Sequence, residues 1–205
     1  MTKSSRYKNK DSVVLENSSM RAEFLPSPGG KMASLICKNT GYEFMVQRRG
    51  TTYLDQPFDG VYVDGECSGY DDMFPTIDAC NYQNAPWRQV KMADHGEVWS
   101  LPWEYRTAKN SLYMAVNGVR FNYTLEKDVY FFNETTLRLN YTLTNHATSD
   151  FEFIWAAHMM INIEEGTKLV VPEECKQVIS VLSNSGRPFG EISDWPYLKD
   201  NQGKA

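Results

Sequence analysis

The feature that most constrains the fold of this chain is an alternation of apolar and polar residues along two long segments. Leu137, Leu139 and Tyr141 are separated by polar residues, and residues 121–126 repeat the pattern from Phe121 onward. A period of two places every second side chain on one face of an extended strand, so each segment predicts an antiparallel strand that covers a core on one side. The chain is therefore expected to be mainly β.

Shorter segments of β character complete this prediction, and turn residues separate them. They are residues 13–16, 20–25, 32–38, 42–46, 98–105, 112–116, 152–162 and 168–171. Asn117-Gly118 between two apolar runs is a strong hairpin signal, and no window longer than about ten residues shows the 3.6-residue period of a helix. So many strands in a chain of this size predict a large sandwich of antiparallel sheets.

Composition narrows the class of protein. The 205 residues, of which 41% are hydrophobic, suffice for one globular domain, expected over residues 13–205 behind a polar segment at residues 1–12. The net charge of −5 comes without a basic stripe, which argues against nucleic acid as a partner. The polar opening leads into no apolar run, so we expect neither a signal peptide nor a membrane partner, and a cytoplasmic location.

Residues 51–91 differ from the rest of the chain because acidic residues stand there among glycines, aromatics and prolines. Long ordered loops on a rigid β scaffold often carry binding residues, so this excursion is a candidate wall of a site. Within it, Asp71 and Asp72 suit two interpretations. Their carboxylates accept hydrogen bonds from sugar hydroxyls, or they cap a short helical turn at residues 73–74.

Two of the three histidines lie close to tryptophans in segments of β character, His95 before Trp99 and His158 after Trp155. An imidazole titrates near neutrality and moves protons at physiological pH. A single histidine is, however, more often a structural residue whose ring nitrogens are hydrogen-bonded within the protein. Likewise, Trp99 and Trp155 either offer flat apolar faces to sugar C–H groups or are plain core residues. The histidines do not have the spacing of metal ligands, so no metal is expected.

Several segments, in the order in which they occur, resemble the aldose 1-epimerase (galactose mutarotase-like) superfamily. They are residues 15–17, 24–35, 69–76 and 94–99, and Asn145-His146 followed by residues 153–158. The resemblance implies an antiparallel β-supersandwich that binds a sugar in a cleft on one sheet. It also implies that His158 protonates the ring oxygen as general acid, and that His95 contacts the sugar and steadies it.

The sequence departs from this family in one respect. The general-base glutamate of aldose 1-epimerases comes late in the domain, and no residue up to Ala205 takes its place by motif. The supersandwich is therefore expected to be incomplete at the C-terminus, with unpaired strand edges that favour a homo-oligomer.

Three functions remain open on this basis. The first is an enzyme that interconverts the α and β anomers of a sugar, more readily a neutral sugar than a sugar phosphate. The second is a non-catalytic carbohydrate-binding protein of the same fold. The third is a sandwich domain that accompanies a polysaccharide lyase or glycosidase domain. No cofactor is expected in any of them.

Overall fold

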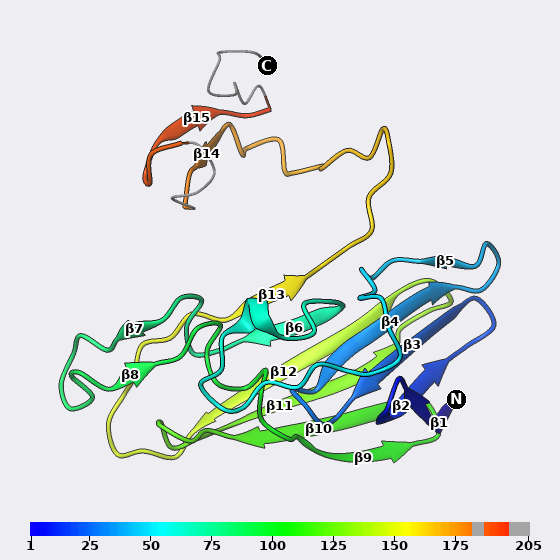
Figure 1. Cartoon of the computed structure of the whole chain (residues 1–205), viewed down its shortest axis with the longest axis horizontal. Helices are drawn as coiled ribbons and strands as arrows, with labels where there is room; N and C mark the ends of the chain where they lie inside the picture. Colours follow the sequence, from blue (N-terminus) through cyan, green and yellow to red (C-terminus); the bar gives the residue numbers. More distant parts are fainter. Residues whose placement is uncertain (182–186, 197–205) are drawn as a thin grey trace. The chain divides into compact units, whose positions relative to one another are not determined.

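The structure is a computed structural model that describes residues 1–181 and 187–196, and it divides into two units, residues 1–162 and 163–205 (Figure 1). Apart from one short 3-10 helix, η1 (Tyr62–Asp64), the regular elements within these described ranges are all β-strands. None of the described residues form a helix of the length and apolar character needed to cross a membrane.

The first unit holds two larger antiparallel sheets and one small pair of strands. The seven-stranded sheet runs in the order β1 (Thr2–Tyr7), β2 (Lys10–Glu16), β3 (Met20–Leu25), β4 (Lys31–Cys37), β6 (Tyr70–Met73) and β13 (Ala156–Met159), and β5 (Tyr42–Glu43) pairs with β4. The four-stranded sheet runs in the order β12 (Leu137–Asn145), β11 (Tyr123–Phe131), β10 (Ser111–Asn117) and β9 (Glu104–Ala108). The small pair is β7 (Cys80–Asn81) with β8 (Lys91–Met92). In the second unit, β14 (Gln177–Ile179) pairs with β15 (Ile192–Asp194).

The core of the first unit lies between its two larger sheets. Leu15 and Phe24 of the seven-stranded sheet and Leu112, Leu125 and Val129 of the four-stranded sheet belong to one cluster of buried side chains. Full burial of one such side chain is worth about 1.5–3 kcal/mol. The inward positions of β11 follow the period of two seen in the sequence. The prediction of a mainly β sandwich is therefore confirmed.

Three local predictions are wrong. Residues 98–103 form no strand, and β9 begins only at Glu104, because Leu101 O and Trp103 N hydrogen-bond to the turn at residues 26–29 instead of to a neighbouring strand. Residues 168–171 lie outside the strands of the second unit, where β14 starts at Gln177. The two aspartates at positions 71 and 72 cap no helical turn, since both belong to β6.

Residues 1–12, set apart in the sequence as a polar segment, form β1 and the start of β2. The turn between these strands also holds the acidic excursion. Lys8 pairs with Glu66, and Tyr53 N donates a hydrogen bond to the side chain of Asn9 at 2.7 Å. Tyr53 in turn packs with Leu25 and Ala33, on the side of the seven-stranded sheet away from the main core. These contacts hold the excursion, including η1, against the outer face of this sheet.

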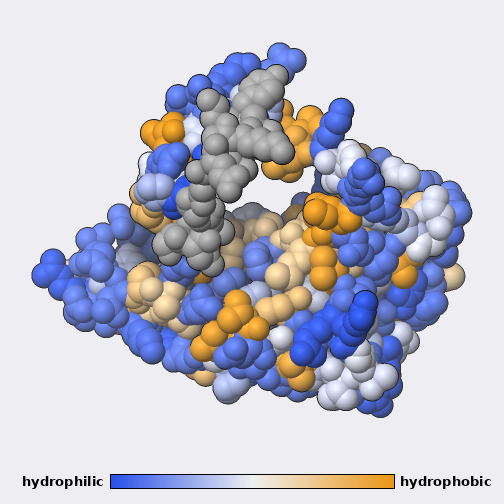
Figure 2. All heavy atoms as spheres, turned by 45° about the horizontal axis from the view of Figure 1, so that its top comes forward, coloured by the Kyte–Doolittle hydropathy of each residue, from blue (hydrophilic) through white to orange (hydrophobic). Residues whose placement is uncertain are grey.

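Apolar side chains remain exposed near β13, the last strand of the seven-stranded sheet. Phe153, Ile154, Met159 and Ile161 are each between 47% and 54% exposed. Figure 2 shows apolar residues in patches on an otherwise hydrophilic face. Contiguous exposed apolar surface is typical of interaction sites, so association through this edge stays a prediction.

Candidate functional site

The pairing of β6 with β13 sorts the two aspartates of β6 onto opposite faces. His158 lies directly opposite Asp71 in the ladder, and Ala157 lies opposite Asp72. Side chains alternate between the two faces of a strand. Asp71 and His158 therefore share the outer face of the seven-stranded sheet, whereas Asp72 points inward and meets Lys127 of the other sheet.

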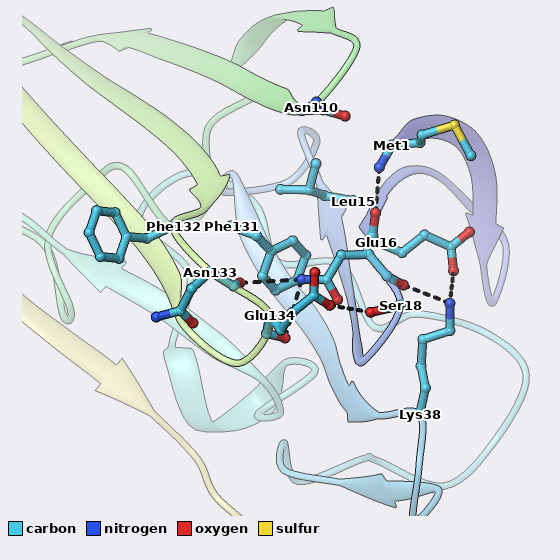
Figure 3. A pocket seen from close by; sticks show the side chains of 11 residues that line it. Met1, Leu15, Glu16, Ser18, Lys38, Asn110, Phe131, Phe132, Asn133 and Glu134 are labelled. Carbon is cyan, nitrogen blue, oxygen red and sulfur yellow. Dashed lines mark hydrogen bonds and ion pairs between the residues drawn. The ribbon is translucent and has the colours of Figure 1, made fainter.

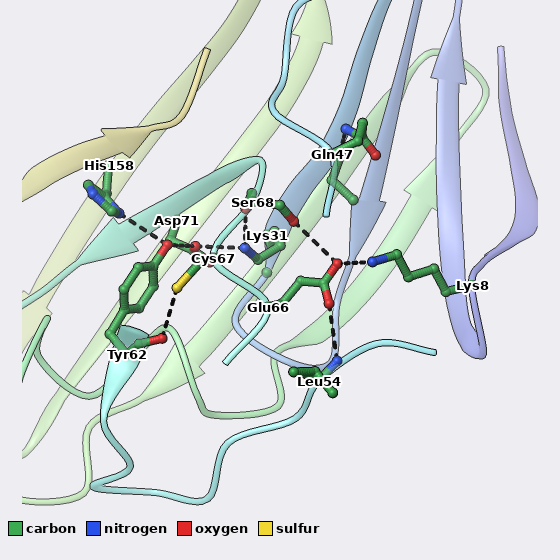
Figure 4. A network of polar contacts seen from close by, with 12 residues as sticks. Lys8, Lys31, Gln47, Leu54, Tyr62, Glu66, Cys67, Ser68, Asp71 and His158 are labelled. Atoms are coloured by element: carbon green, nitrogen blue, oxygen red, sulfur yellow. Dashed lines mark hydrogen bonds and ion pairs between the residues drawn. The ribbon is translucent and has the colours of Figure 1, made fainter. Parts of the chain in front are cut away.

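On the outer face, a chain of hydrogen bonds joins Lys31 to His158 (Figure 4). Lys31 Nζ donates to Asp71 Oδ2 at 2.7 Å, and the hydroxyl of Tyr62 donates to the same oxygen at 2.8 Å. His158 Nδ1 lies 3.1 Å from that hydroxyl. Because the side chains of Lys31 and Asp71 are only 3% and 1% exposed, this ion pair is screened little by solvent. Tyr62 comes from η1, so the excursion and the sheet meet at the histidine.

His95 has a backbone conformation that is uncommon for a residue other than glycine. Its φ is +61°, and that of Gly96 is +74°. Such a conformation is unfavourable by about 1–3 kcal/mol and persists where the surroundings impose it, often at functional sites. Two backbone hydrogen bonds impose it here, from His95 N to Ile77 O and from Glu97 N to Phe74 O, each 2.8 Å long. The turn thereby fixes where the imidazole points.

This turn lays the ring of His95 on the ring of Tyr62, with centroids 4.0 Å apart and planes at 5°. The centroids of the His95 and His158 rings are 4.9 Å apart, and both residues are partly exposed. Nδ1 of His95 lies 2.9 Å from a carboxylate oxygen of Asp94. The structure thus brings the two predicted histidines together on one tyrosine, at the surface.

Asp72 and Trp155 do not belong to this group. Asp72 is fully buried and its Oδ2 accepts a hydrogen bond from Lys127 Nζ at 2.7 Å, while its Oδ1 accepts one from Trp155 Nε1 at 3.1 Å. The ring of Trp155 packs on Tyr141 of β12. Both residues therefore lie on the inner side of the sheet, away from the histidines.

Trp99 and Asp71 lie beneath the histidines, on the protein side of their rings, and are not exposed beside them. Trp99 is buried, its Nε1 donates to the carbonyl of Asp94 at 3.0 Å, and its ring meets that of Tyr62 edge-on. Asp71 is reached through the hydroxyl of Tyr62. These residues hold the site in shape.

Sequence reasoning missed Tyr62, the residue that contacts both histidines. It stands in Val61-Tyr62-Val63, within the irregular excursion, and no motif or period marks it. Its role depends on how the excursion folds back over the sheet. That placement is made by contacts between residues far apart in the sequence.

The electrostatics of the site favour a neutral imidazole at His158. Burial lowers the pKa of His158 below its usual range, and the charge of His95 lowers it further. Burial and then the negative charge of Asp71 raise the pKa of Tyr62, so this hydroxyl keeps its proton. A neutral imidazole beside a protonated phenol can accept or relay a proton near neutral pH.

A cavity of about 640 Å³ lies elsewhere in the first unit, between the β2–β3 and β11–β12 connections (Figure 3). Its polar groups bond one another. Lys38 Nζ donates to Glu16 at 3.2 Å, and Asn17 Nδ2 donates to the carbonyl oxygens of Asn133 and Glu134. The pair of partly exposed histidines, in which burial lowers the pKa of His158, is the better candidate for chemistry.

One solved structure of low sequence identity shares the fold. The Slr1438 protein from Synechocystis sp. PCC 6803 aligns with a TM-score of 0.53 and 17% identity, over 69% of this chain and 51% of that one. A 4-alpha-glucanotransferase from Thermococcus litoralis aligns with a TM-score of 0.45 and 15% identity, over 70% and 24%. The chain thus spans about half the length of Slr1438.

No curated protein matches this sequence. A family match, in contrast, covers nearly the whole chain, including both sheets and both histidines. Residues 1–203 match the family described as a domain of unknown function, DUF5107, and the chain belongs to that family.

Proposed function

We propose that this protein binds a neutral saccharide against His95 and His158 and interconverts its α and β anomers. The observation that carries the proposal is the pair of partly exposed imidazoles, with ring centroids 4.9 Å apart, held on Tyr62. Opening a pyranose ring requires a proton to leave the anomeric hydroxyl and a proton to reach the ring oxygen, and imidazoles do both near neutral pH.

His158 handles the proton in this proposal. Because its pKa is lowered, it is neutral near pH 7 and first takes the proton of the anomeric hydroxyl. The C1–O5 bond then breaks, the anomeric oxygen becomes a carbonyl, and the ring oxygen receives the proton back from His158. Both oxygens are bonded to the same carbon, so one nitrogen serves both. Rotation of the open chain and closure on the other face complete the exchange. His95 accepts a hydrogen bond from a sugar hydroxyl and keeps the substrate in place.

The charges near the site favour a neutral sugar over a sugar phosphate. Lys31 is paired with Asp71 at 2.7 Å and its side chain is only 3% exposed, while Lys127 is paired with Asp72 on the inner side of the sheet, away from the histidines. Neither is available to a phosphate. The family resemblance of the segments that carry Asp71, His95 and His158 supports the same substrate class.

Anomer exchange measured by magnetisation-transfer NMR on common aldoses tests the proposal. We expect the protein to accelerate exchange over buffer, and His158→Ala to lower the rate by about 10²–10⁴-fold, the usual contribution of a general acid–base group. His146→Ala is the matched control, because this histidine bonds Thr124 away from the site. Absence of acceleration for every common aldose would contradict the enzyme assignment.

The exchange rate should also depend on pH in one direction. The neutral form of His158 is the active one, so the rate falls as the pH drops through its pKa, which burial holds below the usual imidazole value of about 6.5. Above that value, we expect the rate to be flat up to neutral pH and beyond. A rate that rises as His158 becomes protonated would reverse its role.

A second candidate function is carbohydrate binding without turnover. It is favoured by the contacts of His158, whose ring meets Tyr62 and His95 but no glutamate among the described residues. Saturation-transfer NMR distinguishes the two candidates, because a binder shows saccharide contact without faster anomer exchange.

A further inference from the structure

The hydroxyl of Tyr62 lies between a carboxylate and an imidazole. It is 2.8 Å from Asp71 Oδ2 and 3.1 Å from His158 Nδ1. A phenolic hydroxyl carries one hydrogen and donates it once, while its oxygen can accept another hydrogen bond. If the hydroxyl donates its hydrogen bond to one neighbour, the other neighbour must donate a hydrogen bond to the hydroxyl oxygen.

Asp71 is the neighbour that must receive it. Its side chain is 1% exposed and pairs with Lys31 at 2.7 Å, so it is an ionised carboxylate, which accepts hydrogen bonds and donates none. Tyr62 therefore donates to Asp71, and its oxygen is left to accept from Nδ1 of His158. A neutral imidazole has only one N–H, so Nε2 then carries a lone pair.

We propose that Tyr62 is a positioning residue that holds His158 in the tautomer with hydrogen on Nδ1 and leaves Nε2 as the proton acceptor facing the ligand. The stack of His95 on Tyr62 and the edge contact of Trp99 keep the phenol ring in place. The titratable rings that face His158 are those of Tyr62 and His95, and the charges of Asp71, Lys31 and Asp94 also act on it.

The catalytic meaning of this tautomer rests on the proposed function, since Nε2 is the atom that takes the anomeric proton. The tautomer itself does not depend on turnover. Free histidine in water prefers the hydrogen on Nε2, so the tautomer with hydrogen on Nδ1 is a state that the protein must impose.

Long-range proton–nitrogen correlation NMR of the full chain reads the tautomer of each of its three histidines directly. At a pH above the imidazole titration, we expect His158 to show a protonated Nδ1 and an unprotonated Nε2. In Tyr62→Phe, which keeps the ring but removes the hydroxyl, the signals should move toward the opposite tautomer.

Tyr70→Phe is the matched control for this measurement. Tyr70 is also a buried tyrosine, and its hydroxyl donates to the neighbouring Asp72 at 3.2 Å without touching His158. Its replacement should leave the His158 tautomer unchanged. Assignment of the His158 signals follows from their loss in His158→Gln.

In anomer exchange, Tyr62→Phe should lower kcat by about ten- to hundredfold, as for lost orienting partners of other functional histidines, with little change in KM. A wild-type His158 with hydrogen on Nε2 overturns the inference even if Tyr62→Phe fails to fold. An unchanged tautomer in a folded Tyr62→Phe also overturns it. If no aldose is exchanged while the tautomer is as expected, the proposed function fails and the positioning by Tyr62 stands.

Discussion

Lys127→Met should lower the free energy of unfolding by about 3–5 kcal/mol, because it leaves the buried carboxylate of Asp72 without its counter-charge. Both side chains are 0% exposed and their charged atoms are 2.7 Å apart. Lys127 also donates to the carbonyl of Gly30 at 2.7 Å, and its ammonium lies 4.8 Å from the ring centroid of Trp103. Urea denaturation followed by tryptophan fluorescence measures the loss, which is a large share of the roughly 5–15 kcal/mol typical of a domain.

Two further variants separate the buried charge from the loss of a long side chain. Lys38→Met removes a solvent-accessible ion pair with Glu16 and should change stability by less than about 1 kcal/mol. Adding Asp72→Asn to Lys127→Met removes the unpaired charge and should recover much of the loss, since Asn still accepts from Trp155. If Lys127→Met alone is as mild as Lys38→Met, Asp72 is not held as a buried charge.

Gly96→Ala should disable the site with the rest of the sandwich formed. An added Cβ at this position would lie 2.1 Å from the carbonyl oxygen of Phe74 and 2.4 Å from its carbon, and φ is +74°. Phe74 is fully buried and directly follows β6, so the turn that carries His95 has to move instead. A shift of about 1 Å in a positioning group reduces rates by about a hundredfold, so we expect anomer exchange to fall by that order.

Gly41→Ala is the matched control, because its φ is +73° but nothing lies within 4 Å of the added Cβ. This variant has the same backbone strain without a steric clash, so it should leave the rate of anomer exchange unchanged. Far-ultraviolet circular dichroism should show strand content in both variants. Equal behaviour of the two would mean that the close approach of Gly96 to Phe74 has no bearing on His95.

The sandwich itself could be predicted from local patterns, because alternation along β11 and β12 reports directly which side of a strand is buried. The alternation does not predict the structure where hydrogen bonds to a distant turn replace the hydrogen-bond ladder between two strands. Residues 98–103 have the composition of a strand, yet Leu101 and Trp103 bond to the turn at residues 26–29. Such a choice depends on residues that are distant in the sequence.

The candidate site was predictable only in part. Its two histidines stood out through their neighbours, and the structure brings them together. The aspartates at 71 and 72 were interpreted as a pair on a loop, whereas consecutive residues in β6 necessarily face opposite ways and meet different lysines. Tyr62 could not be found, since its position depends on the excursion being fastened by Lys8 and Glu66.

Strand β6 directs one aspartate toward the tyrosine that holds the histidines and the next toward the opposite sheet, so four consecutive residues connect the site to the buried interior. The site and the sandwich are therefore expected to unfold together. Binding of a ligand to the folded state adds RT ln(1 + [L]/Kd) to the stability of that state. A saccharide that binds the histidines should therefore raise the melting temperature of the whole sandwich. A thermal-shift screen of saccharides is a direct way to search for the ligand.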